Sequence, residues 1–258
     1  MINIQMEKMN WVDISQAIQK GYTTVVIGIG STEQHGPHLP THTDTLIGEN
    51  LAYRIALRLK NALQAQTIRI GCSDHHLFFP GTISLKKETL KAIIFDYVES
   101  LSRHGFKNII FVPSHGGNFT PTKEAIAELK LKYPELKIIG LTDLMNYMVA
   151  LWNVARKYGI GIEEAGSHAG EIETSQILAL EEEQVKRSRF KPGFVEPVSL
   201  NTNKILFEEG IHVLSEIGVL GDPTKAEIKR GRIYMEKLTN YAVKNIKKTF
   251  LNYKLLTY

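Results

Sequence analysis

Short β-branched runs alternate with longer amphipathic segments over the first half of the chain, and this alternation restricts the fold more than any other feature. The predicted strands are residues 23–29, 67–73, 108–113 and 136–142. In the segments between them, residues 46–63, 85–105 and 121–134, apolar residues recur at spacings of three and four, which is typical of helices. Strands that alternate with helices predict an α/β protein with a mostly parallel sheet covered by helices.

The second half of the chain adds helices rather than strands. Further helices are predicted at about residues 170–186 and 223–248. Residues 188–222 are richer in Pro, Gly and Asn, and we interpret them as a long excursion from the sheet. With 258 residues, 43% of them hydrophobic, and no internal repeat, the sequence predicts one domain over residues 1–258.

Composition narrows the environment and the partners. Basic residues number 31 against 27 acidic ones, and no basic stripe is interleaved with aromatics, so nucleic acid is not an expected partner. The single cysteine, Cys72, cannot form an internal disulfide, which suits a reducing compartment. The N-terminus lacks signal-peptide features, and no apolar run approaches the ~20 residues of a spanning helix. We therefore expect a cytoplasmic protein that does not bind membranes.

Polar, histidine-bearing loops follow the first three predicted strands. They are "GSTEQHG" (30–36), "SDHHLFFPG" (73–81) and "SHGGN" (114–118). In open α/β sheets, ligands bind beyond the carboxyl ends of the strands, where these loops would meet. Three such loops at one edge predict a functional site.

The first loop region carries ligand types that suit a transition metal. Glu33, His35 and Asp44 combine imidazole with carboxylate, the mixture that binds Zn²⁺, Mn²⁺ or Fe²⁺. Glu33 and His35 are two residues apart, so in an extended segment both point to one face. The "SHGGN" loop adds His115. Taken singly, each loop would also fit an ordinary polar turn, and the prediction rests on their combination.

The segment "GSHAGEIETS" (166–175) supplies further candidates. If it is helical, His168 and Glu171 are three residues apart and project from the same side, whereas Glu173 points elsewhere as a supporting carboxylate. The six remaining histidines are expected not to be ligands, although His76 could line a pocket. They are His38, His42, His75, His76, His104 and His212.

Other catalytic motifs fit poorly. "GIGSTE" is not a dinucleotide fingerprint, because Glu33 occupies the third glycine position of G-x-G-x-x-G. Ser114–His115 and Ser167–His168 are adjacent pairs without a G-x-S-x-G elbow, and adjacent side chains do not face each other. The sequence contains no P-loop, CxxC or HExxH motif. Metal-assisted hydrolysis is the interpretation that remains.

Five segments together resemble a known family. "GSTEQHGPHLPTHTD", "FPGTISL", "HGFKNIIFVPSHGGN", "HAGEIETS" and "GVLGDPTKA" are similar, in order, to the motifs of the creatininase family, over about residues 26–232. The resemblance implies a three-layer α/β/α domain with a dinuclear metal centre, assembled as a homo-oligomer, commonly a hexamer. It also implies hydrolysis of carbon–nitrogen bonds in cyclic or linear amides other than ordinary peptides.

Position by position, the resemblance assigns roles to individual residues. It makes Glu33, His35, Asp44 and His115 ligands of two divalent ions, most simply Zn²⁺ with Mn²⁺ or Fe²⁺ as alternatives, and Asp44 bridges them. His168 is similar to the family histidine beside the metal-bound water. Creatinine-hydrolysing members tend to carry HYEN where this chain has "HGGN". We therefore expect Glu171 to complete the ligand set, and creatinine to be a poor substrate.

The expected reaction is attack of a metal-activated hydroxide on the carbonyl of a small cyclic or linear amide, with His168 protonating the leaving nitrogen. Two sister activities stay open: a formamide deformylase in flavin or deazaflavin precursor synthesis, and a peptidase of a modified peptide. A metal-binding structural or regulatory protein is the alternative outside enzymes. The presence of His168 beside a full ligand set argues against it, because a structural site needs no acid.

Overall fold

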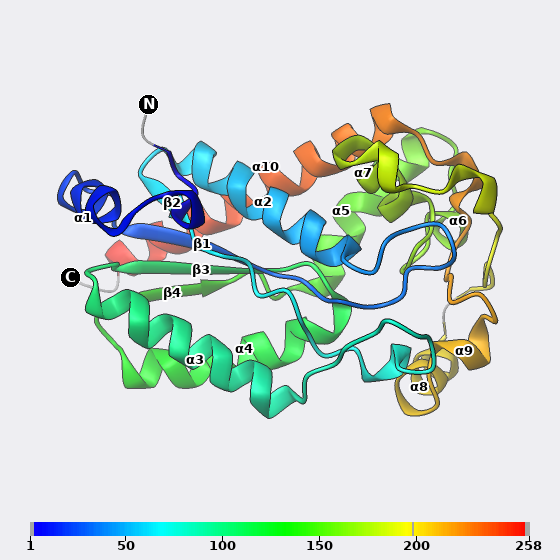
Figure 1. Cartoon of the computed structure of the whole chain (residues 1–258), viewed down its shortest axis with the longest axis horizontal. Coiled ribbons are helices and arrows are strands. Elements are labelled where there is room, and N and C mark those ends of the chain that lie inside the picture. Colours follow the sequence, from blue (N-terminus) through cyan, green and yellow to red (C-terminus); the bar gives the residue numbers. More distant parts are fainter. Residues whose placement is uncertain (1–2, 198, 256–258) are drawn as a thin grey trace.

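The computed structural model describes residues 3–197 and 199–255, and its centre is a parallel sheet. The strands are β1 (Thr24–Ile29), β2 (Ala62–Gln64), β3 (Asn108–Pro113) and β4 (Lys137–Gly140). They lie in the order β2-β1-β3-β4, and every neighbouring pair is parallel (Figure 1). The α/β class predicted from the sequence is confirmed.

Helices cover both faces of this sheet. One face is packed by α1 (Trp11–Gln19), α3 (Lys87–Arg103) and α4 (Phe119–Lys132). The other is packed by α2 (Thr43–Leu59) and α10 (Ile228–Leu255), with α5 (Leu144–Lys157) and α7 (Glu171–Leu180) against α10. Figure 1 shows α2 and α10 on one side of the strands and α3 and α4 on the other. The chain thus has three layers, α/β/α.

The hydrophobic core lies in two layers, one on each side of the sheet. Val26 and Ile110 pack into the layer under α2 and α10, whereas Val25 and Ile109 pack into the layer under α3 and α4. This alternation follows the two-residue period of a strand. Because both faces are covered, the strands are apolar along their whole length, which explains the unbroken β-branched runs.

The second predicted strand is misplaced. The helix predicted over residues 46–63 ends at Leu59, because Lys60 adopts a left-handed conformation with a φ of 68°. The chain then turns at once into β2, which pairs with Thr24–Val26 of β1. The predicted strand 67–73 keeps only an isolated bridge between Ile68 and Ile29. It runs along the end of β1 as irregular chain.

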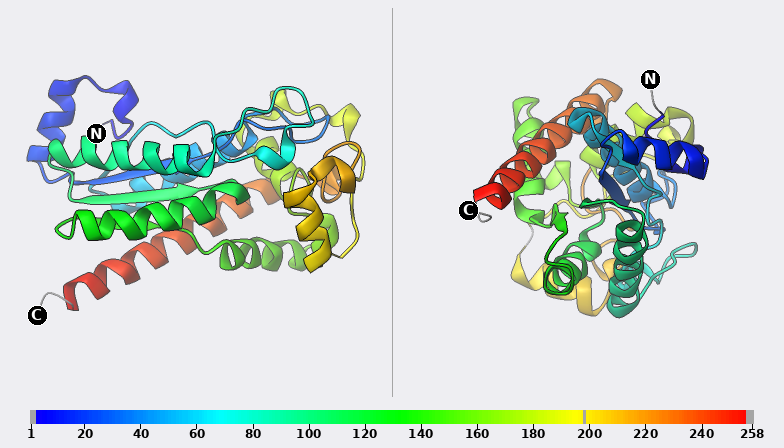
Figure 2. Two further views of the ribbon diagram at one scale, coloured as in Figure 1. Left: turned by 90° about the horizontal axis from the view of Figure 1, so that it is seen from below. Right: turned by 90° about the vertical axis from the view of Figure 1, so that its left-hand side faces the viewer.

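Short elements gather beyond the carboxyl ends of the strands (Figure 2). They include α6 (Ile162–Ala165), α8 (Leu200–Glu208), α9 (Ile211–Leu214) and the 3₁₀ turns Asp74–His76 and Gly116–Asn118. The remaining 3₁₀ turns are Met6–Lys8, Glu182–Gln184, Arg187–Arg189 and Pro223–Lys225. The predicted helix 170–186 ends earlier, at Leu180, and the predicted excursion 188–222 contains α8 and α9. In the part of the chain that the structure describes, no helix is long and apolar enough to cross a membrane.

Candidate metal centre

Four of the predicted ligands meet at the carboxyl edge of the sheet. Glu33 and His35 lie in the loop after β1, Asp44 lies in the first turn of α2, and His115 directly follows β3. All four are at most 4% exposed. Donor atoms of Glu33, His35 and Asp44 lie within 4.8 Å of one another. Buried carboxylates at such close range need compensating positive charge.

The two carboxylate oxygens of Asp44 face different histidines. Its Oδ1 lies 3.6 Å from Nε2 of His35, and its Oδ2 lies 3.4 Å from Nδ1 of His115. Oε1 of Glu33 lies 3.1 Å from the same His115 nitrogen. Asp44 therefore stands between two groups of donors, one containing His35 and the other containing Glu33 and His115.

Backbone carbonyls orient the two imidazoles. His115 donates from Nε2 to the carbonyl of Cys72 at 2.9 Å, and His35 donates from Nδ1 to the carbonyl of Glu33 at 3.1 Å. In each ring the other nitrogen faces the carboxylates, where it would bind a metal ion once it has lost its proton. Metal-binding histidines in proteins are commonly held in this way, by a hydrogen bond from the ring nitrogen that does not bind the metal.

Three donor atoms of this cluster lack hydrogen-bond partners. They are Oε1 of Glu33, Nε2 of His35 and Oδ2 of Asp44, and all three are buried without a hydrogen bond among the described residues, although charged side chains lie near them. Buried polar atoms in folded proteins are nearly always paired. Divalent cations bound among these atoms would satisfy all three, so the residues present fit a metal centre.

The carboxylates also stabilise positive charge on the imidazoles. Burial opposes protonation of His35, but the nearby Asp44 carboxylate outweighs it and raises the pKa of His35 to about 9. Burial likewise opposes protonation of His115, yet the charges of Glu33 and Asp44 raise its pKa well above the usual value. The cluster thus favours positive charge between the carboxylates and the imidazoles. A metal ion that binds here would displace the protons from His35 and His115.

Glu171 does not join the cluster, and the prediction that it completes the ligand set is corrected. Its Oε1 accepts hydrogen bonds from Arg230 Nε and Ser175 Oγ, both at 2.6 Å, and its Oε2 accepts one from Tyr234 Oη at 2.6 Å. These contacts tie α7 to α10. The prediction assumed a helix through His168, but α7 begins only at Glu171, so the three-residue spacing does not place the two side chains on one face.

Glu173 lies where Glu171 was expected. Its Oε2 is 3.8 Å from His35 Nε2, and its side chain is 20% exposed. Two residues along a helix are about 200° apart around its axis, so Glu173 points away from the side on which Glu171 contacts α10. Ala169 donates its backbone N–H to the same oxygen at 2.5 Å, from a left-handed conformation with a φ of 53°. Once the start of α7 is known, the E-x-E spacing identifies Glu173 as the candidate ligand.

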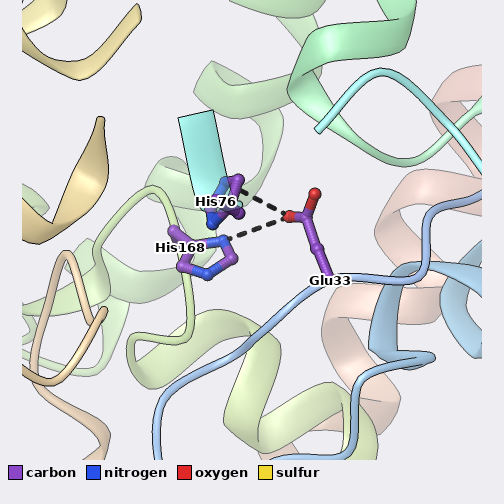
Figure 3. A group of neighbouring side chains, drawn as sticks. All are labelled: Glu33, His76 and His168. Atoms are coloured by element: carbon purple, nitrogen blue, oxygen red, sulfur yellow. Dashed lines mark ion pairs between the residues drawn. The ribbon is translucent and has the colours of Figure 1, made fainter. Parts of the chain in front are cut away.

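His168 faces the cluster from the loop before α7. Its Nδ1 lies 3.6 Å from Oε1 of Glu33 (Figure 3). Its Nε2 donates to the backbone carbonyl of Gln34 at 2.8 Å. The Gln34 side-chain nitrogen is also 3.0 Å from this Nε2, but its protons are used by the carbonyl of Gly218 and by His76. We therefore assign the proton to Nε2 of His168 and the lone pair to Nδ1.

His76 reaches the cluster as well, although it was expected only to line a pocket and not to be a ligand. Its Nε2 lies 3.4 Å from the same Glu33 oxygen, as Figure 3 shows. Its Nδ1 accepts a hydrogen bond from Gln34 Nε2 at 2.9 Å, because Gln34 Oε1 already accepts from Gly36 N–H at 2.8 Å. His76 thus presents an N–H to Glu33 rather than a lone pair. Its position in the polar loop "SDHHLFFPG" was the sequence feature that indicated a place at the site.

The other histidines lie outside the groups of candidate ligands that the described residues form. They are His38, His42, His75, His104 and His212. His38 bonds to Thr174 Oγ1 at 2.9 Å, and the ring of His75 lies 5.7 Å from that of His115.

A cavity of about 580 Å³ opens over the cluster. Asp44, His115, His168 and Glu173 line its inner end, and apolar side chains from α5 and α8 form much of the rest. A pocket of this volume is within the range that binds drug-sized molecules.

The "HGGN" loop has no room for a side chain at Gly117. A Cβ at this position would lie 2.1 Å from the carbonyl oxygen of Cys72 and 2.7 Å from Nε2 of His115. A glutamate could not stand here without displacing the loop. The carboxylate beside His35 comes from Glu173 instead.

Comparisons with known proteins relate this chain to one family. The family model described as creatininase, creatinine amidohydrolase, matches residues 7–246. A mycofactocin precursor peptide peptidase from Mycobacterium ulcerans (strain Agy99) is 30% identical over 240 residues, 90% of this chain and 88% of that protein. A creatinine amidohydrolase from Pseudomonas putida is 27% identical over 190 residues, 67% of this chain and 70% of the other.

Solved structures share the fold. A structure described as "Creatininase Mn" superposes with a TM-score of 0.78 at 22% identity, over 96% of this chain and 99% of the other. A creatinine amidohydrolase-like protein from Bacteroides fragilis NCTC 9343 gives a TM-score of 0.73 at 20% identity, over 96% and 97% of the two chains.

This chain belongs to the creatininase family. It is a metal-dependent amidohydrolase, and the expected class, a hydrolase of carbon–nitrogen bonds, is confirmed.

Proposed function

We propose that the chain holds two divalent ions that share Asp44. Glu33, His115 and Oδ2 of Asp44 would hold one ion, and His35, Glu173 and Oδ1 of Asp44 the other. The observation that carries the proposal is the orientation of Asp44, whose two oxygens face two different histidines at 3.6 and 3.4 Å. Zn²⁺ suits this mixture of imidazole and carboxylate, with Mn²⁺ and Fe²⁺ as alternatives.

Such ions, when bound, supply Lewis acidity that polarises a carbonyl and lowers the pKa of water. The chain's own part in the reaction is proton transfer and orientation. Nδ1 of His168 takes the proton of the attacking water and then delivers it to the leaving nitrogen. The Gln34 carbonyl supports this role, because it holds the other ring nitrogen at 2.8 Å and so keeps Nδ1 directed at the cluster.

His76 has a different part in the proposal. Its N–H points at Glu33 Oε1 at 3.4 Å, so it stabilises the negative charge of that carboxylate and fixes its direction. Gln34 holds both histidines in place, one through its side chain and one through its backbone.

The proposed substrate is a small amide whose C–N bond is cleaved, as in the creatinine amidohydrolase from Pseudomonas putida. A peptide is the second candidate. The 30% identity to peptidases of the mycofactocin precursor peptide supports it, and so does the volume of the cavity, about 580 Å³, which exceeds what a single small ring would fill. We also propose that the chain acts as one domain, in the cytoplasm, and as a homo-oligomer.

A hydrolase screen tests this function. The protein, loaded with Zn²⁺ or Mn²⁺, is offered creatinine, formylaminopyrimidines, hydantoin-like rings, short amides and short peptides. We expect hydrolysis of at least one amide, abolished by a chelator and restored by metal. Failure to cleave any of them in the metal-loaded protein would contradict the proposal.

A further inference from the structure

The cavity over the metal centre has an apolar wall that the proposed chemistry does not require. Leu144, Met145 and Met148 of α5 line it, together with Leu206 and Phe207 of α8. Helix α5 ends at Lys157 and α8 begins at Leu200, more than forty residues later, yet both helices line this one cavity.

Part of this wall is open to solvent. Met145 is 66% exposed and Phe207 is 60% exposed. Apolar side chains that gather in the exposed wall of a pocket, next to a reactive centre, commonly mark a ligand-binding surface.

The charges around the cavity are all of one sign apart from its histidines. Its acidic lining residues are Asp44 and Glu173 at the inner end, and Glu163 and Glu196 elsewhere. Among the described residues no lysine or arginine lines the cavity. Neither Glu163 nor Glu196 forms an ion pair in the described part of the chain. A substrate carboxylate held away from the metals would therefore meet repulsion, and an ammonium group would meet attraction.

From this lining we infer that the substrate is an amide with a bulky apolar group next to the scissile bond. Beyond that group, its far end is neutral or cationic and carries no carboxylate. The inference rests on the proposed function, because the scissile carbonyl must lie at the ligand cluster. The apolar group then lies against α5 and α8, and the far end of the molecule lies near Glu163 and Glu196. A small polar ring would leave this wall in contact with water.

Hydroxamates test this inference, since they bind to metal centres through one end and carry any group at the other. The probes are acetohydroxamic acid, octanohydroxamic acid, 8-aminooctanohydroxamic acid and suberic acid monohydroxamate. Their dissociation constants are measured by calorimetry on the Zn²⁺-loaded protein. We expect octanohydroxamic acid to bind at least about tenfold more tightly than acetohydroxamic acid, because its chain buries apolar surface. We expect the amino probe to bind about fivefold more tightly than the acid probe at low salt, with a smaller gap at high salt.

Two variants assign the charge effect to the cavity. Glu163→Gln combined with Glu196→Gln should bring the ratio between the amino and acid probes close to one. Glu183→Gln removes an exposed carboxylate that does not line the cavity, and it should leave the ratio unchanged.

The outcomes separate the inference from the function beneath it. If acetohydroxamic acid binds but the longer probes gain nothing, or the acid probe binds best, the inference is wrong and the metal centre stands. If no hydroxamate binds to metal-loaded protein, the proposed function itself is contradicted.

Discussion

Glu171 and Glu173 are two residues apart in α7, yet they have different contacts. Glu171 is fully buried against Arg230 and Tyr234, whereas Glu173 faces His35. We predict that Glu173→Ala lowers the metal content by about one ion per chain, because it removes one carboxylate from the group around His35. Glu171→Gln is the matched control and should keep the metal content of the folded protein. Elemental analysis of gel-filtered protein measures both, and metal loss only in the Glu171 variant would restore the original assignment.

A substitution of His168 tests whether this residue is a catalyst or a metal ligand. Its Nδ1 is 3.6 Å from Glu33 Oε1, close enough to serve water at the cluster. His168→Ala should keep most of the metal and lose roughly 10²–10⁴-fold in kcat, the usual range for a lost acid or base. The activity is followed on whichever amide the hydrolase screen identifies. Loss of the metal together with the activity would make His168 a ligand instead.

At the scale of single residues, the sequence was informative wherever a side chain followed a strand. Glu33, His35 and His115 could be grouped because parallel strands bring their carboxyl-end loops together. Glu171 was misjudged because its direction depends on the residue at which α7 starts, and "HAGE" does not reveal that start. His76 was underestimated because its position depends on Gln34, a contact between two separate loops.

At the scale of elements, α7 and α10 are joined by a buried polar network. Tyr234 is 0% exposed and donates its hydroxyl to Glu171, which also accepts from the Arg230 guanidinium. We predict that Tyr234→Phe lowers the free energy of unfolding by about 1–3 kcal/mol, since a buried carboxylate oxygen loses its partner. Urea unfolding measures this change.

The control for that measurement is Tyr53→Phe in α2, whose hydroxyl has no hydrogen bond among the described residues. It should change stability by less than about 0.5 kcal/mol. An equal loss of unfolding free energy in the two variants would show that the network between α7 and α10 makes no specific contribution to stability.

Elements with strong periodicity were predicted well, and short ones were not. The long helices α2, α3 and α4 fall close to their predicted ranges, and β1 and β3 match theirs within a residue. Strand β2 has only three residues, too few to display a period of two. Helix α2 ends where Lys60 adopts a left-handed backbone conformation. Non-glycine residues rarely adopt this conformation, so a lysine in the sequence does not predict it.

At the scale of the whole molecule, the sheet brings loops from distant parts of the chain to one edge, and the pocket built there decides the substrate. Gly117 leaves no space for a glutamate, and the carboxylate from Glu173 enters from another side. We predict that creatinine is a poor substrate, with a kcat/KM below about 10⁴ M⁻¹s⁻¹, the lower end for typical enzymes. Steady-state kinetics on metal-saturated protein checks this, and a higher value would show that the loop does not exclude creatinine.

The proposed metal centre requires two ions that share the carboxylate of Asp44. Elemental analysis of protein reconstituted with Zn²⁺ or Mn²⁺, with Asp44→Ala measured alongside, tests this most directly. Because each Asp44 oxygen faces a separate histidine, we predict about two ions per wild-type chain, and loss of both metal and activity in the variant. A wild-type value near zero or one, or an Asp44→Ala protein that still holds two ions, would contradict the account.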